Sequence, residues 1–167
     1  MATTYEPIAT ATAASNGTAF TFSSIPSTYT DLRVVLSGTA VTNTATPRMQ
    51  LNSDTATNYS VTNLYGTGTA AGTTKNNSTA YYINGNDNTG MSSTIPSLIT
   101  VDIFSYAGST YKSILSTSSD DINAAGGGVC RNVGTWRSTS AISTVYLFVS
   151  NGYKIGTTAT IYGIKAA

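Results

Sequence analysis

Histidine is absent from this 167-residue chain, and only 9% of its residues are charged. An average soluble domain has about 25% charged residues, so hydroxyl and amide groups must cover most of the surface here. The sequence indeed contains 31 threonines and 21 serines. Without histidine the chain also lacks the commonest general base of enzymes. These absences favour a structural or binding role, and we predict that the protein is not an enzyme.

Clustered charge and long apolar runs are scarce as well. The net charge is +1, from eight cations and seven anions that no window concentrates. Nucleic-acid binding depends on clustered lysine and arginine, so we expect no nucleic-acid partner. No stretch approaches the roughly 18 apolar residues of a membrane span, and the first residues lack the features of a secretory signal. We therefore expect no membrane partner and a chain made in the cytoplasm.

Cysteine occurs once, at Cys130. A lone cysteine can form neither an internal disulfide nor a zinc site by itself, and no histidine is present to activate it. We expect it to be a small core residue of a strand. Asp120 and Asp121 are the only adjacent acids, and we expect them to be solvated or turn-forming, because neighbours on a strand point to opposite faces. The sequence thus predicts no catalytic residue, no metal site and no cofactor.

Alternation of apolar and polar residues dominates the chain, and helical periodicity is almost missing. Leu32, Val34 and Leu36, for example, share one face, whereas Arg33 and Ser37 take the other. Such alternation is typical of half-buried strands. It predicts strands at 20–22, 32–36, 99–103, 145–149 and 155–164. The apolar positions predict a core of Phe20, Phe22, Leu32, Val34, Leu36, Ile99, Val101, Ile103, Val145, Leu147, Val149 and Ile161.

Turn signals separate these segments, among them Asn16-Gly17, Asn84-Gly85 and Asn151-Gly152. Successive strands are often 8 to 15 residues apart, a spacing that suits a sandwich or a barrel. We therefore predict an all-β protein, an antiparallel β-sandwich of the jelly-roll type with about eight to ten strands. The choice between two Greek keys and an immunoglobulin-like strand order is open here, because the sequence does not contain the pairing.

Two segments depart from this order. Residues 1–14 are polar and interrupted by Pro7, and we expect an N-terminal arm or edge strand that lies along a neighbouring subunit. Residues at about 64–90 are rich in glycine, threonine and asparagine, and they predict a long loop or a pair of short, exposed strands. Both segments are expected to order against a partner. The remaining chain has no linker-like gap, so we predict a single β-sandwich domain over 15–167.

Eleven tyrosines are the richest feature of the sequence. Tyrosine offers a large contact area with a polar tip and is enriched at binding interfaces. In a surface with few charges, these residues suit extended protein–protein contact or sugar stacking. The residues that we predict at an interface come from the N-terminal segment and from predicted turns: Tyr5, Pro7, Tyr65, Tyr81, Tyr82 and Tyr153.

Two motifs resemble a known family. The run from Phe20 to Gly38, FTFSSIPSTYTDLRVVLSG, combines a strand, a proline turn and a second strand, and TIYGIK follows at 160–165. Together they resemble small β-sandwich virion proteins of tailed bacteriophages, in which an F-x-F-S-x-I-P-x-x-Y-x-D-L opening and a T-I-Y-G-I-K closing strand are similar in pattern. The resemblance implies a structural protein of the virion, made in the host cytoplasm.

The resemblance further implies a capsid decoration, or cement, protein: a symmetric oligomer, most simply a homotrimer, that binds the major capsid protein and bridges neighbouring capsid subunits. The composition agrees, because a neutral surface can form many hydrogen bonds without the desolvation cost of buried ions. The alternative is a tail-associated or fibre-associated domain that binds the host surface. Its partner would then be a host-surface glycan or a tail protein.

Overall fold

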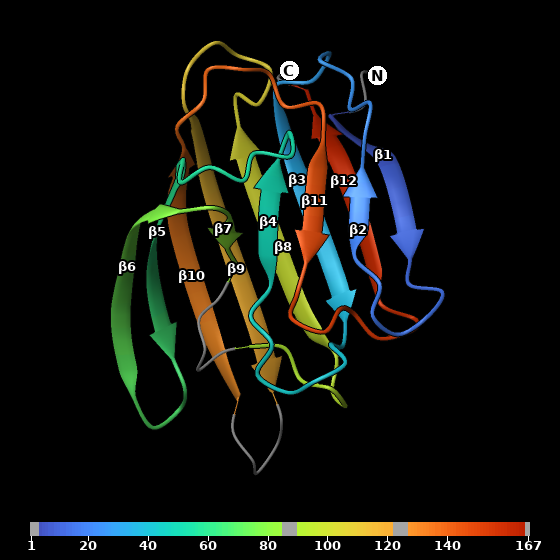
Figure 1. The fold of residues 1–167 in the computed structure, drawn as a ribbon, viewed down its shortest axis with the longest axis vertical. Helices are drawn as coiled ribbons and strands as arrows, with labels where there is room; N and C mark the ends of the chain where they lie inside the picture. Colours follow the sequence, from blue (N-terminus) through green and yellow to red (C-terminus); the bar gives the residue numbers. More distant parts are fainter. Residues whose placement is uncertain (1–3, 85–89, 122–126, 166–167) are drawn as a thin grey trace.

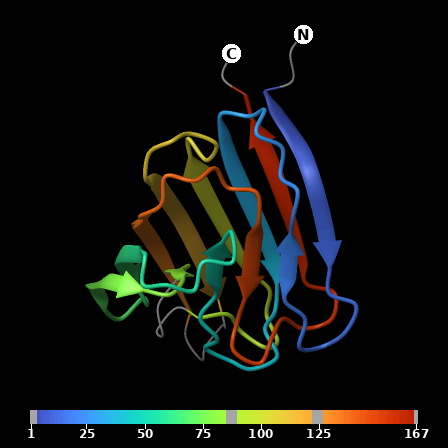
Figure 2. The same ribbon diagram turned by 45° about the horizontal axis from the view of Figure 1, so that its top comes forward.

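The computed structural model describes residues 4–84, 90–121 and 127–165. These residues form twelve β-strands and no helix, so no helix in the described ranges could cross a membrane. The strands form an eight-stranded and a four-stranded antiparallel sheet, which pack as two layers (Figures 1 and 2). The predicted all-β antiparallel sandwich is confirmed, with twelve strands against the expected eight to ten.

The large sheet contains, in spatial order, β1 (Tyr5–Thr12), β12 (Thr158–Ile164), β3 (Asp31–Gly38), β8 (Ser97–Phe104), β9 (Lys112–Asp121), β10 (Gly127–Trp136), β5 (Tyr59–Gly66) and β6 (Ala71–Thr79). The small sheet contains β2 (Phe20–Phe22), β11 (Val145–Phe148), β4 (Arg48–Leu51) and β7 (Tyr82–Ile83).

The strand order is that of a jelly roll with two inserted hairpins. Four strands of the large sheet lie in the order β1-β12-β3-β8, and the small sheet lies in the order β2-β11-β4-β7. Along the chain these eight strands alternate between the two sheets, except that β4 and β7, which flank the inserted β5–β6 pair, both belong to the small sheet, as in two Greek keys of a jelly roll. The hairpins β9–β10 and β5–β6 then extend the large sheet beyond β8.

The hairpin β5–β6 and the short strand β7 occupy most of the region that the sequence predicts as a long loop at 64–90. The described part of this region therefore agrees with the expected alternative of exposed strands and not with a single long loop, whereas residues 85–89 lie outside the described residues. The edge strand β6 is exposed or half-buried along its whole length. A strand that contributes no face to the core needs no apolar alternation, so the pattern that identified the other strands is missing here.

The N-terminal segment is an edge strand of the large sheet. From residue 5 to residue 12, β1 pairs with β12, and Ile8 and Ala11 pack against the core. Pro7 lies within this strand, and the register shifts between Pro7 and Ala9. Proline and a bulge are common at edges, where they prevent further strand pairing. This part of the segment therefore belongs to the domain itself, not to a neighbour, while residues 1–3 lie outside the described residues.

The core lies between the facing surfaces of the two sheets. All twelve predicted core residues are buried, and so is Cys130. The largest fully buried side chains include five aromatic residues that the alternation did not select: Tyr59, Tyr82, Tyr106, Trp136 and Tyr153.

Close packing against Gly134 provides a test of this core. A Cβ added at Gly134 of β10 would collide with the Ser60 carbonyl oxygen and with the ring of Tyr82. We predict that Gly134→Ala lowers the free energy of unfolding by about 1–3 kcal/mol, as overpacking typically does, measured by chemical denaturation. Gly66→Ala on β5 is the matched control, because nothing lies within 4 Å of its added Cβ. Equal stability of the two variants would contradict this packing.

Candidate binding surfaces

The solvent-facing side of the eight-stranded sheet, here called the outer face, has an apolar and neutral character. Among the described residues, eight large hydrophobic side chains are exposed, and six of them lie on this face. The six come from the edge strand β1 and from the inner strands β5, β8 and β10: Tyr5, Leu64, Leu98, Phe104, Val129 and Val133. Contiguous apolar patches mark interaction sites, whereas single exposed apolar side chains are common, so the breadth and low charge of this face distinguish it more than its individual hydrophobic residues.

Strand register places these side chains in rows across the outer face in which polar residues lie between them. Leu98 of β8 lies opposite Ser119 of β9, which in turn lies opposite Val129 of β10. In another row, Leu115 lies opposite Val133. Hydroxyl-bearing threonines and serines fill most of the positions between them. The resulting surface is a mosaic of aliphatic and hydroxyl groups.

One ion pair neutralises the charge near the middle of the outer face. Arg33 donates from Nε and Nη2 to the two carboxylate oxygens of Asp102, at 2.5 and 2.9 Å. The same guanidinium carbon lies 5.9 Å from the ring centre of Tyr5, whose ring packs against that of Tyr162 at 4.7 Å. The bidentate geometry fixes Arg33 in place, so this charged pair adds no net charge to the surface.

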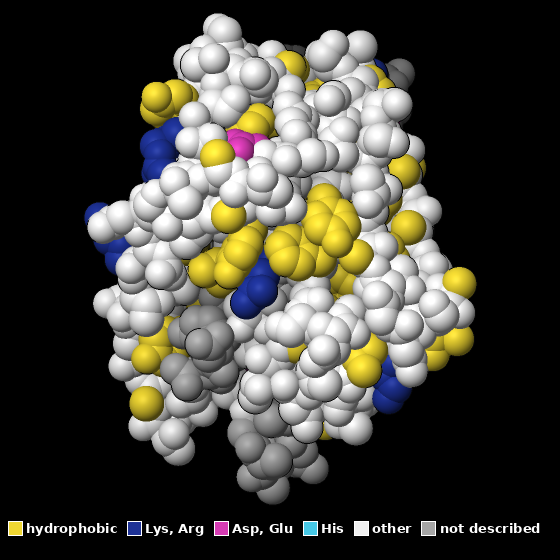
Figure 3. Space-filling view, in the orientation of Figure 1, with side chains coloured by type: hydrophobic (Ala, Val, Ile, Leu, Met, Phe, Trp, Pro, Cys, Tyr) yellow, Lys and Arg dark blue, Asp and Glu magenta, His cyan; other side chains and the backbone are white. Residues whose placement is uncertain are grey.

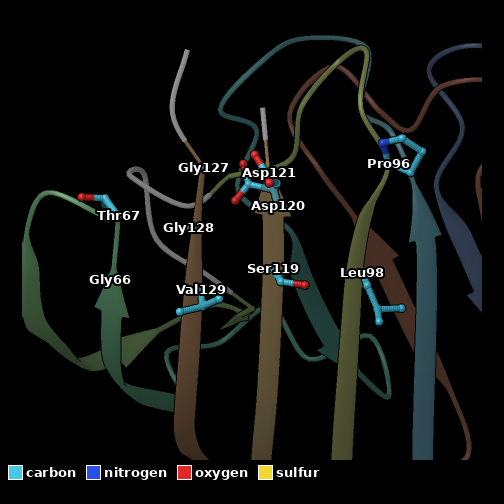
Figure 4. A pocket seen from close by; sticks show the side chains of 11 residues that line it. Gly66, Thr67, Pro96, Leu98, Ser119, Asp120, Asp121, Gly127, Gly128 and Val129 are labelled. Carbon is cyan, nitrogen blue, oxygen red and sulfur yellow. The ribbon is translucent and has the colours of Figure 1, made fainter. Parts of the chain in front are cut away.

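A hollow of about 690 Å³ lies at the β9–β10 end of the outer face (Figure 4). Asp120, Asp121 and the Gly127-Gly128 backbone form one wall, and Leu98 and Val129 contribute apolar surface. A second hollow of about 450 Å³ between β5 and β10 shares Val129 with the first. The two hollows therefore extend the outer face into a shallow groove.

The two adjacent acids are part of β9, opposite Gly127 and Gly128 of β10, and not part of a turn as expected. Asp120 is half-buried and Asp121 is exposed, in keeping with the opposite directions of neighbouring strand residues. Burial raises the pKa of the Asp120 carboxyl, and repulsion from Asp121 adds to this effect. No cluster of three metal-ligating side chains exists among the described residues.

A second surface lies on the opposite side of the sandwich, on the solvent-facing side of the small sheet. We use the name aromatic cluster for Tyr81, Tyr146, Phe148 and the neighbouring Arg48. The ring of Tyr146 stacks on Phe148 at 5.0 Å, and Tyr81 meets Phe148 edge-on at 5.8 Å. Figure 3 views this side of the molecule and shows a hydrophobic patch at its centre, next to a basic side chain.

Strand geometry brings the aromatic cluster together. Tyr146 and Phe148 alternate on β11, and Phe148 pairs with Arg48 of β4. Tyr81 precedes β7, and its carbonyl accepts a hydrogen bond from the Thr79 hydroxyl at 2.7 Å. Gln50, which pairs with Tyr146, donates to the Ala80 carbonyl at 3.0 Å. These two bonds fix the backbone on both sides of Tyr81, so its ring has a defined position.

Within the described part of the chain, Arg48 has neither a carboxylate partner nor an acceptor for its Nε. Its guanidinium carbon lies 4.6 Å from the centre of the Tyr81 ring. Its Nε is buried without a hydrogen-bond partner, and within the described ranges no carboxylate forms an ion pair with it. A partly desolvated cation is costly unless an anion or acceptors approach it. The cluster therefore combines ring faces with an unpaired positive charge.

The structure divides the six predicted interface residues among different environments. Tyr5 and Pro7 lie exposed on β1 at the edge of the large sheet. Tyr81 belongs to the aromatic cluster. Tyr65, at the end of β5, is half-buried and lines the smaller hollow.

The predictions for Tyr82 and Tyr153 are wrong, because both side chains are buried in the core. The hydroxyl of Tyr82 lies 3.3 Å from the Ser116 hydroxyl, and Tyr153 stacks on Phe20 at 5.1 Å. Burial raises the pKa of both phenols. Their nearness to turns suggested exposure, but turns at the rim of a sandwich also direct side chains into its interior.

Sequence reasoning missed Arg48, Tyr146 and Phe148 as members of one site. The available signal was the pair of aromatic residues on the outward positions of the predicted strand 145–149. A solvent-facing strand position usually holds a polar residue, so two aromatic residues in alternate outward positions were informative. Arg48 and Tyr81 had no such signal, because their place beside these rings depends on the pairing of β4 with β11 and β7.

Comparison of the chain with models of protein families and with curated protein sequences gives no match. The architecture by itself defines the class of the protein: an all-β, two-sheet antiparallel sandwich domain.

The half-buried carboxyl of Asp120 gives a pH-dependent prediction. Its pKa is higher in the folded than in the unfolded state, so stability decreases as pH rises through that interval and remains reduced above it. We predict that Asp120→Asn raises the melting temperature at neutral pH, and that this gain vanishes below about pH 3, where the wild-type carboxyl is protonated in both states.

Asp121→Asn is the comparison variant for this measurement. It removes the neighbouring charge, and with it the repulsion that adds to the effect of burial on Asp120, so we expect any gain in melting temperature to be smaller than that of Asp120→Asn. A melting temperature of Asp120→Asn below that of the wild type at neutral pH would contradict the prediction.

Proposed function

We propose that the protein is a virion structural protein of tailed bacteriophages, a decoration protein that binds the major capsid protein on the outer capsid as a symmetric homotrimer. One observation supports this proposal above the others: the outer face of the large sheet, which is broad, almost neutral and supplied with six exposed hydrophobic side chains. The jelly-roll strand order agrees with the resemblance of residues 20–38 and 160–165 to small virion sandwiches.

A partner can cover the outer face at a low free-energy cost. Burying isolated charges at an interface is expensive, whereas aliphatic and hydroxyl groups can be covered at little cost when their hydrogen bonds are replaced. The only described ion pair on the outer face is bidentate and internally neutral. A flat surface of this kind suits repeated contacts between copies and with a shell. Several weak contacts in one oligomer then add up through multivalency.

A catalytic role has no support in the described residues. The chain has no histidine, its cysteine is buried, and Asp120 and Asp121 are neighbours on one strand, the first half-buried and the second exposed. Paired carboxylates of glycosidases must instead converge on one bond. The proposed role is therefore mechanical, because the protein would bridge capsid subunits and raise the free energy needed to separate them.

A second candidate is a tail-associated or fibre-associated domain that binds the host surface. The aromatic cluster of the small sheet favours it, because solvent-facing rings beside an unpaired guanidinium suit a sugar ligand better than a capsid protein. In the decoration proposal the outer face contacts the capsid. In the alternative the small sheet contacts the host surface, so a substitution on the outer face distinguishes the two proposals.

A charge introduced on the outer face tests the decoration proposal. We predict that Val133→Asp weakens trimer formation and shell occupancy at least about 100-fold, because each interface would bury an unpaired carboxylate. Light scattering measures the oligomer, and co-sedimentation with undecorated capsid shells measures occupancy. Ile155→Asp is the matched control, since Ile155 is as exposed as Val133, 60% against 55%, but lies in the loop before β12.

Binding of the wild type should change little between low and high salt, because few charges are available to be screened. A wild-type chain that is monomeric and binds no shell would overturn the decoration proposal. Equal loss of binding in Val133→Asp and Ile155→Asp would remove the outer face from it.

A further inference from the structure

We infer that the aromatic cluster of the small sheet is a binding site for an acidic saccharide, with a sugar carboxylate on Arg48 and the sugar ring on Tyr146 and Phe148. This inference deepens the second candidate function and does not depend on the decoration proposal, because the cluster lies on the side of the sandwich opposite the outer face. It concerns the isolated protein and a soluble ligand.

The unpaired guanidinium indicates the charge of the ligand. Arg48 contacts the Tyr81 ring, its Nε is buried without a partner, and no carboxylate in the described part of the chain forms an ion pair with it. Arginine presents a planar set of donors that matches a carboxylate in bidentate fashion. An anionic group arriving from solvent would supply the acceptors that the described part of the chain does not provide. The ligand is therefore expected to have a carboxylate.

The rings indicate the remainder of the ligand. Tyr146 and Phe148 stack nearly parallel, at an interplanar angle of 17°, and both are half-buried on a sheet face. Such rings leave part of their surface to solvent, where the C–H groups of a pyranose can pack. Thr21 and Gln50 lie opposite Tyr146 on the neighbouring strands, so a hydroxyl and an amide oxygen flank the rings. This arrangement of apolar surface with polar edges suits sugar hydroxyls.

Other ligand classes fit the cluster less well. A protein partner needs roughly 800 Å² of surface on each side, whereas three rings and one arginine cover only a small part of this face (Figure 3). Nucleic-acid binding requires several cations, and this cluster has one. A small acidic sugar requires one cation and a partly exposed ring, and both are present.

The test uses oligogalacturonate as the acidic probe and its methyl ester as the neutral probe of the same sugar. Isothermal titration calorimetry measures the affinity of the isolated protein for each. We expect the wild type to bind the acid at least about tenfold more tightly than the ester, as a charge-assisted hydrogen bond allows. Arg48→Gln should reduce the affinity for the acid to that for the ester. Tyr146→Leu, which keeps side-chain bulk but removes the flat ring, should weaken both.

Two control variants distinguish binding at the aromatic cluster from non-specific attraction of the probe to any exposed cation or ring. Arg131→Gln removes an exposed cation on the outer face, and Tyr111→Ala removes an exposed ring outside the cluster. Both should bind as the wild type does, and thermal melts confirm that every variant is folded.

Failure of the wild type to prefer the acid, including a complete absence of binding, would overturn the inference. So would an unchanged preference in Arg48→Gln, unchanged affinities in Tyr146→Leu, or an equal loss in Arg131→Gln. None of these outcomes affects the shell-binding experiment, which uses a different face and a different readout.

Discussion

The unequal size of the two sheets is the constraint on which the rest of the structure depends. Four strands face eight, so the small sheet cannot cover the whole inner surface of the large one. Large aromatic side chains close the uncovered part at β5 and β10. Tyr59 and Trp136 pair across these strands, with ring centres 6.3 Å apart, and Tyr82 of β7 packs over Gly134. Their bulk replaces strands that the small sheet lacks.

Hydrogen bonds hold these aromatic residues in position. Trp136 donates from its indole nitrogen to Asp54 at 2.7 Å, and the Tyr59 hydroxyl accepts from the Leu51 amide at 2.9 Å. Burial opposes ionisation of Asp54, but donors from Asn58, Trp136 and the Ala56 amide outweigh it and lower the pKa of this carboxyl. A buried indole or phenol without such partners would be destabilising. The loop before β5 thus ties the small sheet to the inserted hairpins.

The same part of the core contains polar side chains that satisfy one another. Asn132 donates to the Ser116 hydroxyl at 2.9 Å, and the Cys130 thiol lies 3.0 Å from the Asn132 side-chain oxygen. Buried polar groups are tolerated when paired in this way. The abundant hydroxyl and amide residues therefore serve both the surface and the interior of the protein. They cover the outer face, and they also form part of the interior beneath the inserted hairpins.

The alternation of apolar residues by itself determined the all-β class and the central strands, because a side-chain period of two leaves only one way to bury Leu32, Val34 and Leu36 together. It could not reveal β6, which buries no face, or distinguish Tyr82 and Tyr153 from surface tyrosines. The aromatic cluster was decided only by the tertiary structure. Arg48 and Phe148 are a hundred residues apart in the chain, and they become neighbours only because β4 pairs with β11, a long-range contact that local sequence preferences do not encode.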